Sequence, residues 1–191
     1  MTSVYFVRHA QPDFICSDDV TRSLTTEGEK DSKKVAEAFK NIYLDFVISS
    51  PYLRSIKTIK QTAEMHGLEI YKDMRFQECD KGNNGNNIEM FRRRWADFDY
   101  HEDGGESLIS VQERNISALF DVLDAHHDKN IMIGTHGTAL STILNYFDKN
   151  FGCDDFLRII DFMPYVIRLD FEGRKCISKE EILIIEKIFK Q

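Results

Sequence analysis

The chain has 191 residues, of which 42% are hydrophobic, and it carries a formal net charge of -7 at pH 7. A chain of this size can bury a core of ordinary size, so we expect a single domain over residues 1–191. The acidic balance argues against a nucleic-acid or membrane-surface binder, because such proteins present a basic face to phosphates; a few local cations still suffice for a small phosphorylated molecule.

The predicted elements begin with Val4-Tyr5-Phe6-Val7, a β-branched and aromatic run typical of a buried strand. A polar loop over residues 12–23 follows, and strands and helices then alternate along the chain, which predicts an α/β fold. The predicted strands cover residues 4–7, 44–48, 69–73, 131–134, 165–169 and 175–177. The predicted helices cover residues 25–42, 51–66, 88–95, 106–126 and 138–147.

Two of these strands end in a histidine. Arg8-His9 follows the first strand, and Thr135-His136-Gly137 follows the strand at 131–134. Ligands of open α/β sheets bind at the carboxyl ends of the strands. We therefore expect His9 and His136 to lie in one site.

The residue types near these strand ends suit a phosphoryl group. Arg8 lies beside His9, and Arg54 falls in the first turn of the predicted helix that begins at Pro51, where exposed amides and the helix dipole favour an anion. Arginine binds phosphate through charge-assisted hydrogen bonds, and a neutral histidine is a competent nucleophile toward phosphorus. Glu78, in the loop after the third strand, is a candidate for the proton donor that a leaving alkoxide requires.

Residues 79–105 carry the weakest structural signal. The segment begins rich in glycine and asparagine and ends acidic and irregular, so we expect an insertion or lid there. Its only basic cluster is Arg92-Arg93-Arg94, between Phe91 and Trp95. The run is either one solvated helix face with the two aromatic residues turned inward, or a source of an arginine that binds a second anionic group of the substrate.

Ordered motifs along most of the chain resemble those of the histidine phosphatase, or phosphoglycerate mutase-like, superfamily. The matching segments are Val7-Arg8-His9-Ala10, Leu24-Thr25-x-x-Gly28, Ser49-Ser50-Pro51-Tyr52-Leu53-Arg54-Ser55 with Gln61-Thr62-Ala63, Glu78 with Gly82, Gly104-Gly105-Glu106-Ser107, and Gly134-Thr135-His136-Gly137. Two departures are Ala10 in place of the usual glycine and the lack of a tryptophan and a second glycine after the acid.

The resemblance implies a three-layer α/β/α sandwich with a mostly parallel central sheet and a metal-independent phosphohistidine mechanism without a cofactor. It implies that His9 is the nucleophile, that Arg8, Arg54 and His136 form the phosphate pocket, and that Glu78 is the proton donor. Gln11, in the loop after His9, could also donate to the phosphoryl group. Asp80 and Glu106 are reserve candidates for the acid, and the remaining histidines are expected at the surface: His66, His101, His126 and His127.

These observations favour a phosphomonoester hydrolase acting on a small phosphorylated metabolite. One alternative is a phosphoglycerate mutase, in which the phosphohistidine returns its phosphoryl group to bound substrate. Another is a phosphate-binding scaffold without turnover. No pattern specifies an oligomeric state.

The expected location is cytoplasmic, because no apolar segment approaches the roughly 20 residues needed to span a bilayer and the N-terminus lacks the features of a signal peptide. The cysteines are widely scattered and form no C-x-x-C pair, so we expect reduced thiols and neither a zinc site nor a disulfide framework. They are Cys16, Cys79, Cys153 and Cys176.

Overall fold

A computed structural model of the chain describes residues 1–83 and 85–187. Within those residues, one six-stranded sheet has the strand order β3-β2-β4-β1-β5-β6. The strands β3, β2, β4 and β1 are parallel, whereas β5 is antiparallel to both β1 and β6. The strands are β1 (Thr2–Arg8), β2 (Phe46–Ser49), β3 (Ile70–Lys72), β4 (Asn130–Thr135), β5 (Phe162–Glu172) and β6 (Lys175–Glu186). The helices are α1 (Thr26–Ala38), α2 (Leu53–Met65), α3 (Ile88–Ala96), α4 (Leu108–Ala125), α5 (Gly137–Phe147), α6 (Cys153–Ile159) and the 3-10 helix η1 (Met74–Phe76).

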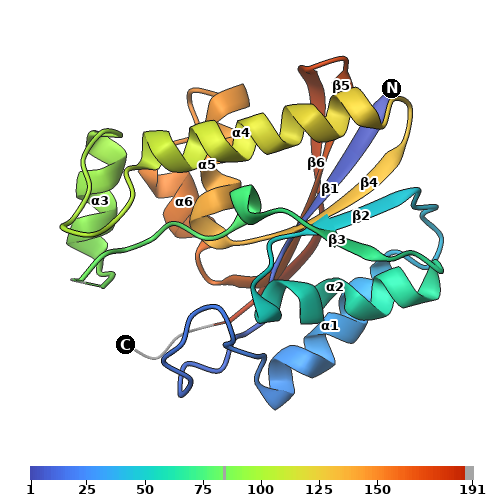
Figure 1. Ribbon diagram of the computed structural model, residues 1–191, viewed down its shortest axis with the longest axis horizontal. Coiled ribbons are helices and arrows are strands. Elements are labelled where there is room, and N and C mark those ends of the chain that lie inside the picture. Colours follow the sequence, from blue (N-terminus) through green and yellow to red (C-terminus); the bar gives the residue numbers. More distant parts are fainter. Residues whose placement is uncertain (84, 188–191) are drawn as a thin grey trace.

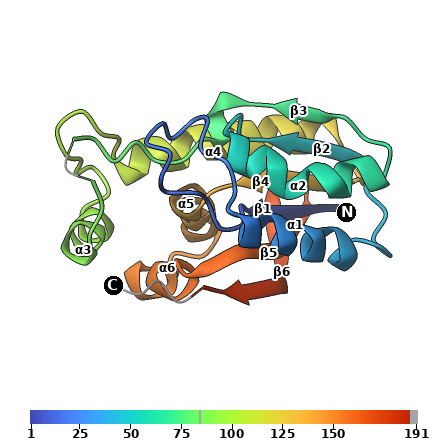
Figure 2. The ribbon, with the colours of Figure 1, turned by 90° about the horizontal axis from the view of Figure 1, so that it is seen from below.

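Helices cover both faces of this sheet (Figure 1). The helices α1 and α2 lie on one face and α4 and α5 on the other, and the view from below shows α1 and α2 in front of the strands (Figure 2). Successive side chains of a strand point to opposite faces, which gives the sheet two cores. Val4 and Phe6 of β1 belong to the core of α4 and α5, whereas Tyr5 and Val7 belong to the core of α1 and α2. The predicted three-layer α/β/α sandwich with a mostly parallel sheet is confirmed.

Local sequence signals explain where several helices begin. The hydroxyl oxygens of Thr25 and Ser107 accept hydrogen bonds from the first turns of α1 and α4, at 3.0 Å from Gly28 N and 3.3 Å from Ser110 N. Such caps satisfy amides that have no partner inside a helix. The helix predicted from Pro51 begins instead at Leu53, with Tyr52 as its cap residue.

Other elements differ from the sequence prediction. The helix expected to reach residue 42 ends at Ala38, because the next residues form tighter turns, such as Ile42 N donating to Phe39 O at 3.0 Å. The short helix α6 was not predicted. The last strand, expected over residues 175–177, extends to Glu186, because pairing with β5 continues along a mostly exposed strand.

The segment 79–105 carries α3, which lies away from the central sheet near α6 (Figures 1 and 2). Phe91 of α3 packs edge-on against Phe156 of α6, with ring centroids 5.1 Å apart. The segment is therefore attached to the rest of the fold through an aromatic contact. None of the helices in the described part of the chain combines the length and the apolar character needed to cross a membrane.

Candidate active site

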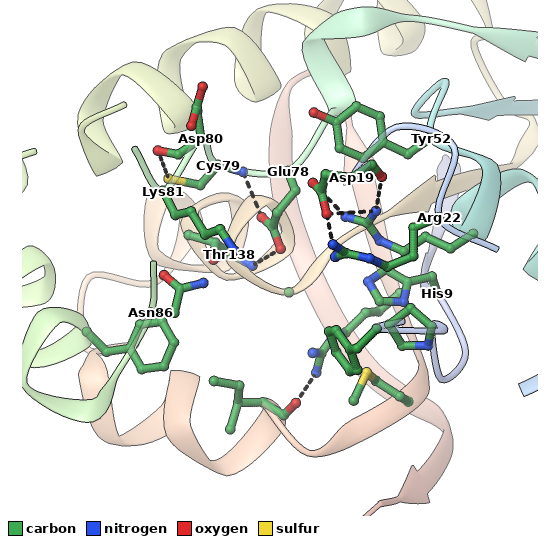
Figure 3. A pocket seen from close by; sticks show the side chains of 18 of the residues that line it. His9, Asp19, Arg22, Tyr52, Glu78, Cys79, Asp80, Lys81, Asn86 and Thr138 are labelled. Atoms are coloured by element: carbon green, nitrogen blue, oxygen red, sulfur yellow. Dashed lines mark hydrogen bonds and ion pairs between the residues drawn. The ribbon is translucent and has the colours of Figure 1, made fainter. Parts of the chain in front are cut away.

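The carboxyl ends of three parallel strands meet at one edge of the sheet. His9 follows β1, Ser50 follows β2 and His136 follows β4. A cavity of about 630 Å³ lies over this edge, and its lining includes His9 and three other predicted site residues (Figure 3). Those three residues are Arg8, Arg54 and Glu78.

His9 is held in one tautomer. Its Nδ1 lies 2.8 Å from the carbonyl oxygen of Ala10. Because a carbonyl oxygen only accepts, Nδ1 carries the proton and Nε2 has the lone pair. Burial lowers the pKa of His9 well below its ordinary value of 6.5, and the neighbouring charges of Arg54 and Arg8 lower it further. His9 is therefore a neutral imidazole whose Nε2 is available as a nucleophile.

His136 lies directly beside this imidazole. The two rings meet edge-on, with centroids 5.2 Å apart. Its Nε2 is 2.7 Å from Ser50 Oγ, which itself accepts from Tyr52 N at 3.3 Å. With the Ser50 hydroxyl donating to Nε2, Nδ1 carries the proton, and this buried atom has no partner among the described residues.

His136 is fully buried, and within the described chain it is not one of the residues that line the cavity. Burial lowers its pKa well below 6.5, and the charges of Arg54 and Arg8 act in the same direction. The second histidine is thus also neutral, and its ring lies directly behind that of His9, which does line the cavity.

Arg8 is fixed by backbone carbonyls. Its Nη1 donates to the carbonyl oxygens of Ile159, Ile160 and Phe162, at 2.5, 2.7 and 3.1 Å. Burial lowers the pKa of Arg8 to about 10, which still leaves the guanidinium charged at neutral pH. A Cβ atom at Gly137 would lie 3.2 Å from Cζ of Arg8, so a glycine there lets the guanidinium approach the first turn of α5.

Arg54 lies in the first turn of α2, as predicted, but it has an unpredicted partner. Its Nη1 donates to the backbone oxygen of Asp19 at 2.6 Å, and its Nη2 lies 3.3 Å from Asp19 Oδ2. Arg22 donates to the other carboxylate oxygen, Oδ1, at 2.6 Å. Asp19 and Arg22 both line the cavity, and sequence reasoning missed both. The sequence feature that could have indicated them is their place in the polar loop over residues 12–23, directly after the strand that ends at His9.

The Glu78 carboxylate caps the start of α5. Its Oε1 accepts from Cys79 N at 2.9 Å and from Ala139 N at 3.1 Å, and its Oε2 accepts from Thr138 N at 3.2 Å (Figure 3). Free amides in the first turn of a helix favour a negative charge. The same turn of α5 follows His136, so the acid and the second histidine are positioned by one local structure.

A partly buried ion pair holds the loop that carries Glu78. Arg114 of α4 donates to the carbonyl oxygens of Arg75, Gln77 and Glu78, at 2.7, 2.8 and 3.1 Å. It also pairs with Glu106, whose Oε2 accepts from Asp80 N at 3.0 Å. Against the effect of burial, hydrogen bonds from Arg114 and Asp80 N lower the pKa of Glu106. Glu106 is therefore occupied in positioning this loop.

The arginine run does not have one common role. Arg94 is 3% exposed and pairs with the buried Glu102 through a 2.8 Å contact, and it also donates to Asn86 Oδ1 at 2.7 Å. The interpretation of the run as one solvated face is therefore wrong for Arg94. The guanidinium of Arg93 lies 3.8 Å from the ring centroid of Tyr100. Among the described residues, none of Arg92, Arg93 and Arg94 lines the cavity.

The remaining candidates lie elsewhere or have other partners. Gln11 accepts a hydrogen bond from Thr25 Oγ1 at 2.9 Å and is not among the described residues that line the cavity, whereas Asp80 is. None of His66, His101, His126 and His127 lines it either, within the same residues. Where the chain is described, no group of His, Cys, Asp and Glu side chains is arranged to hold a metal ion.

The sandwich and the residues at its strand ends define a phosphoglycerate mutase-like α/β protein. A family model described as the histidine phosphatase superfamily (branch 1) matches residues 4–179. The chain therefore belongs to the histidine phosphatase superfamily.

Individual relatives agree with this family. The chain is 28% identical over 180 residues to phosphoserine phosphatase 1 of Hydrogenobacter thermophilus, covering 81% of this chain and 83% of that protein. It is 28% identical over 149 residues to the uncharacterized phosphatase PhoE of Bacillus subtilis, and the match covers 75% of this chain and 76% of that protein. The structure of phosphoserine phosphatase from Entamoeba histolytica in complex with 3-phosphoglyceric acid superposes on this chain with a TM-score of 0.77 at 19% sequence identity. The superposition covers 96% of this chain and 98% of that chain. This last similarity shows the fold.

Proposed function

We propose that the protein is a metal-independent phosphomonoester hydrolase that acts on a small phosphorylated metabolite through a phosphohistidine intermediate on His9. The observation that carries this proposal is the state of His9. Its Nδ1 is held by the Ala10 carbonyl, its Nε2 has no hydrogen-bond partner among the described residues, and its pKa is lowered well below 6.5 by burial and by Arg54 and Arg8. Membership of the histidine phosphatase superfamily supports the same chemistry.

The reaction has two steps. In the first, Nε2 of His9 attacks the phosphorus atom, the bond between phosphorus and the alcohol oxygen breaks, and Glu78 gives a proton to the leaving oxygen. In the second, Glu78 takes a proton from a water molecule whose oxygen attacks the phosphohistidine. The phosphorus–nitrogen bond breaks, inorganic phosphate leaves and His9 is neutral again.

The other predicted residues bind the phosphoryl group. Arg8 and Arg54 stabilise the charge that spreads over the phosphoryl oxygens in the transition state. His136 donates to one of these oxygens through Nδ1, the buried atom that has no partner in the described chain.

Several apolar side chains line the cavity, and we expect them to receive the alcohol portion of the substrate. They are Phe91, Phe156, Ile160 and Met163. A substrate with an apolar or aromatic surface would bury it here. To test this, kcat/KM should be compared for benzyl phosphate and glycerol phosphate, two alkyl phosphates that differ in apolar surface.

Truncation of Phe91 to alanine should lower kcat/KM for benzyl phosphate by about three- to tenfold, because the aromatic contact is lost. The value for glycerol phosphate should change less. Equal losses for both substrates would show that Phe91 supports the segment 79–105 and does not contact the alcohol portion.

The hydrolase proposal is tested with p-nitrophenyl phosphate in the presence of EDTA. We expect turnover that survives chelation, an acid-labile phosphoenzyme in rapid-quench samples, and loss of both in His9→Ala. The exposed His127 offers a matched control, and His127→Ala should retain both. Absence of turnover on every phosphomonoester would favour the scaffold alternative. Dominant conversion of 3-phosphoglycerate to 2-phosphoglycerate in the presence of 2,3-bisphosphoglycerate would favour the mutase alternative.

A further inference from the structure

Asp19 lies between two guanidinium groups of the cavity. Arg54 lies on one side, with contacts of 3.3 Å from Nη1 to Oδ1 and from Nη2 to Oδ2. Arg22 lies on the other, with Nη1 2.6 Å from Oδ1 (Figure 3). A carboxylate and a phosphoryl group use the same donors of arginine in the same bidentate manner. Asp19 therefore holds the donors of Arg54 that a bound phosphoryl group needs, through its carboxylate and also through its backbone oxygen, which lies 2.6 Å from Nη1.

The two partners of this contact differ in how firmly they are fixed. The side chain of Arg54 is 4% exposed, whereas that of Asp19 is 46% exposed. Arg54 belongs to the first turn of α2, but Asp19 belongs to a loop between β1 and α1. The carboxylate can therefore leave toward solvent, while the guanidinium stays at the carboxyl edge of the sheet.

Arg22 is positioned to remain when Asp19 leaves. Its Nε donates to the carbonyl oxygen of Cys16 at 2.9 Å, and its guanidinium lies 5.4 Å from the ring centroid of Phe14. The side chain is only 12% exposed, it lines the cavity, and its charge acts on His9. These contacts leave Nη1, the atom now bound to Asp19, directed at the same anion-binding space.

We propose that Asp19 occupies the place of the substrate's phosphoryl oxygens in the free protein, that the substrate displaces it, and that Arg22 then joins Arg54 as a phosphoryl-binding residue. This inference rests on the proposed function, because it describes how the phosphoryl group of the substrate binds at the same site. The carboxylate acts as an internal competitor: each phosphoryl group that binds must replace its contacts with the two guanidinium groups. Arg22 is accordingly a further substrate-binding residue.

The experiment measures the binding of inorganic phosphate, by calorimetry and as the inhibition constant against p-nitrophenyl phosphate, for the whole protein. Asp19→Asn should bind phosphate about three- to tenfold more tightly, since a neutral amide competes less for the guanidinium groups. Asp18→Asn is the matched control. Asp18 accepts hydrogen bonds from Val20 N and Thr21 Oγ1 of the same loop, and its substitution should leave phosphate binding unchanged.

Arg22 is tested in the same assay. Arg22→Gln should weaken phosphate binding by about fivefold or more, and Arg22→Lys should recover part of the loss. In the Asp19→Asn background, Arg22→Gln should weaken phosphate binding by at least the same factor, because Arg22 then has no competing carboxylate. Near-ultraviolet circular dichroism and thermal unfolding establish that each variant is folded.

Two results would overturn the inference. If Asp19→Asn binds phosphate no more tightly than the parent, the carboxylate positions Arg54 and does not compete. If Arg22→Gln binds phosphate as the parent does, Arg22 only organises its loop. A failure of the proposed function would give another result. The parent would bind phosphate, and Asp19→Asn would bind it more tightly, but neither protein would hydrolyse any phosphomonoester.

Discussion

The two buried histidines predict how stability depends on pH. His9 is 5% exposed and His136 is fully buried, and burial lowers the pKa of each well below 6.5. Below pH 6.5 the unfolded chain binds a proton at each of these imidazoles, whereas the folded chain does not. Because the unfolded state then holds more protons, the free energy of unfolding must fall as the pH falls through this range.

The magnitude follows from the linkage relation. Each histidine that stays neutral in the fold lowers the free energy of unfolding by about 1 kcal/mol between pH 7 and pH 5.5. His9 and His136 together account for about 2 kcal/mol. With an m-value of about 2 kcal/mol/M, the urea midpoint should fall by about 1 M over the same interval.

Urea unfolding followed by circular dichroism measures this change in phosphate-free buffer, because bound phosphate would stabilise the folded state. His136→Gln removes one of the two protonation sites, so its midpoint should fall by only about half as much. The exposed His127 offers the control, and His127→Gln should retain the full change. A midpoint that does not move between pH 7 and pH 5.5, or an undiminished change in His136→Gln, would refute the reasoning.

Three further predictions concern single substitutions. Glu78→Gln should slow glycerol phosphate turnover by about 100-fold or more and p-nitrophenyl phosphate far less, because the nitrophenolate hardly needs a proton; equal losses would exclude Glu78 as the acid. Gly134→Ala should lower the free energy of unfolding by about 1–3 kcal/mol in a urea titration, because its Cβ would lie 2.5 Å from Ser49 Oγ; an unchanged midpoint would contradict this packing. Arg94→Leu should accelerate limited proteolysis within residues 79–105, because Glu102 loses its buried partner, whereas Arg93→Leu should not; equal rates would argue against this anchor.

The sequence predicted the layers and the meeting of the two histidines for a physical reason. Buried parallel strands such as β1 and β4 are short apolar runs with clear ends, and a residue that follows such a strand must lie at the carboxyl edge of the sheet. His9 and His136 each follow one, so their ring contact was predictable without knowing the path of the chain between them. Arg54 was found in the same way, because a proline near the start of a helix marks its first turn.

Features that depend on long-range pairing were missed. In the sequence, Arg94 looks equivalent to Arg92 and Arg93, because its pairing with Glu102 is visible only in the structure. Most side chains of β6 are exposed, so the full length of this strand has no alternating hydrophobic pattern. The helix α6 is too short for a helical period to be recognised. In each case the structure depends on a partner that is not adjacent in sequence. Local propensity carries no information about such a partner.

The first turn of α5 connects the separate parts of the site. Its amides at Thr138 and Ala139 bind the Glu78 carboxylate, its Gly137 makes room for Arg8, and His136 caps the helix. A shift of this turn would therefore move the Glu78 carboxylate, the Arg8 guanidinium and His136 together. Such a shift is opposed from both sides of the turn: β4 pairs with β1 and β2 before it, and α5 is packed against the core after it. The rigidity that the proposed catalysis requires at this site thus comes from the central sheet and not from the loops that close the cavity.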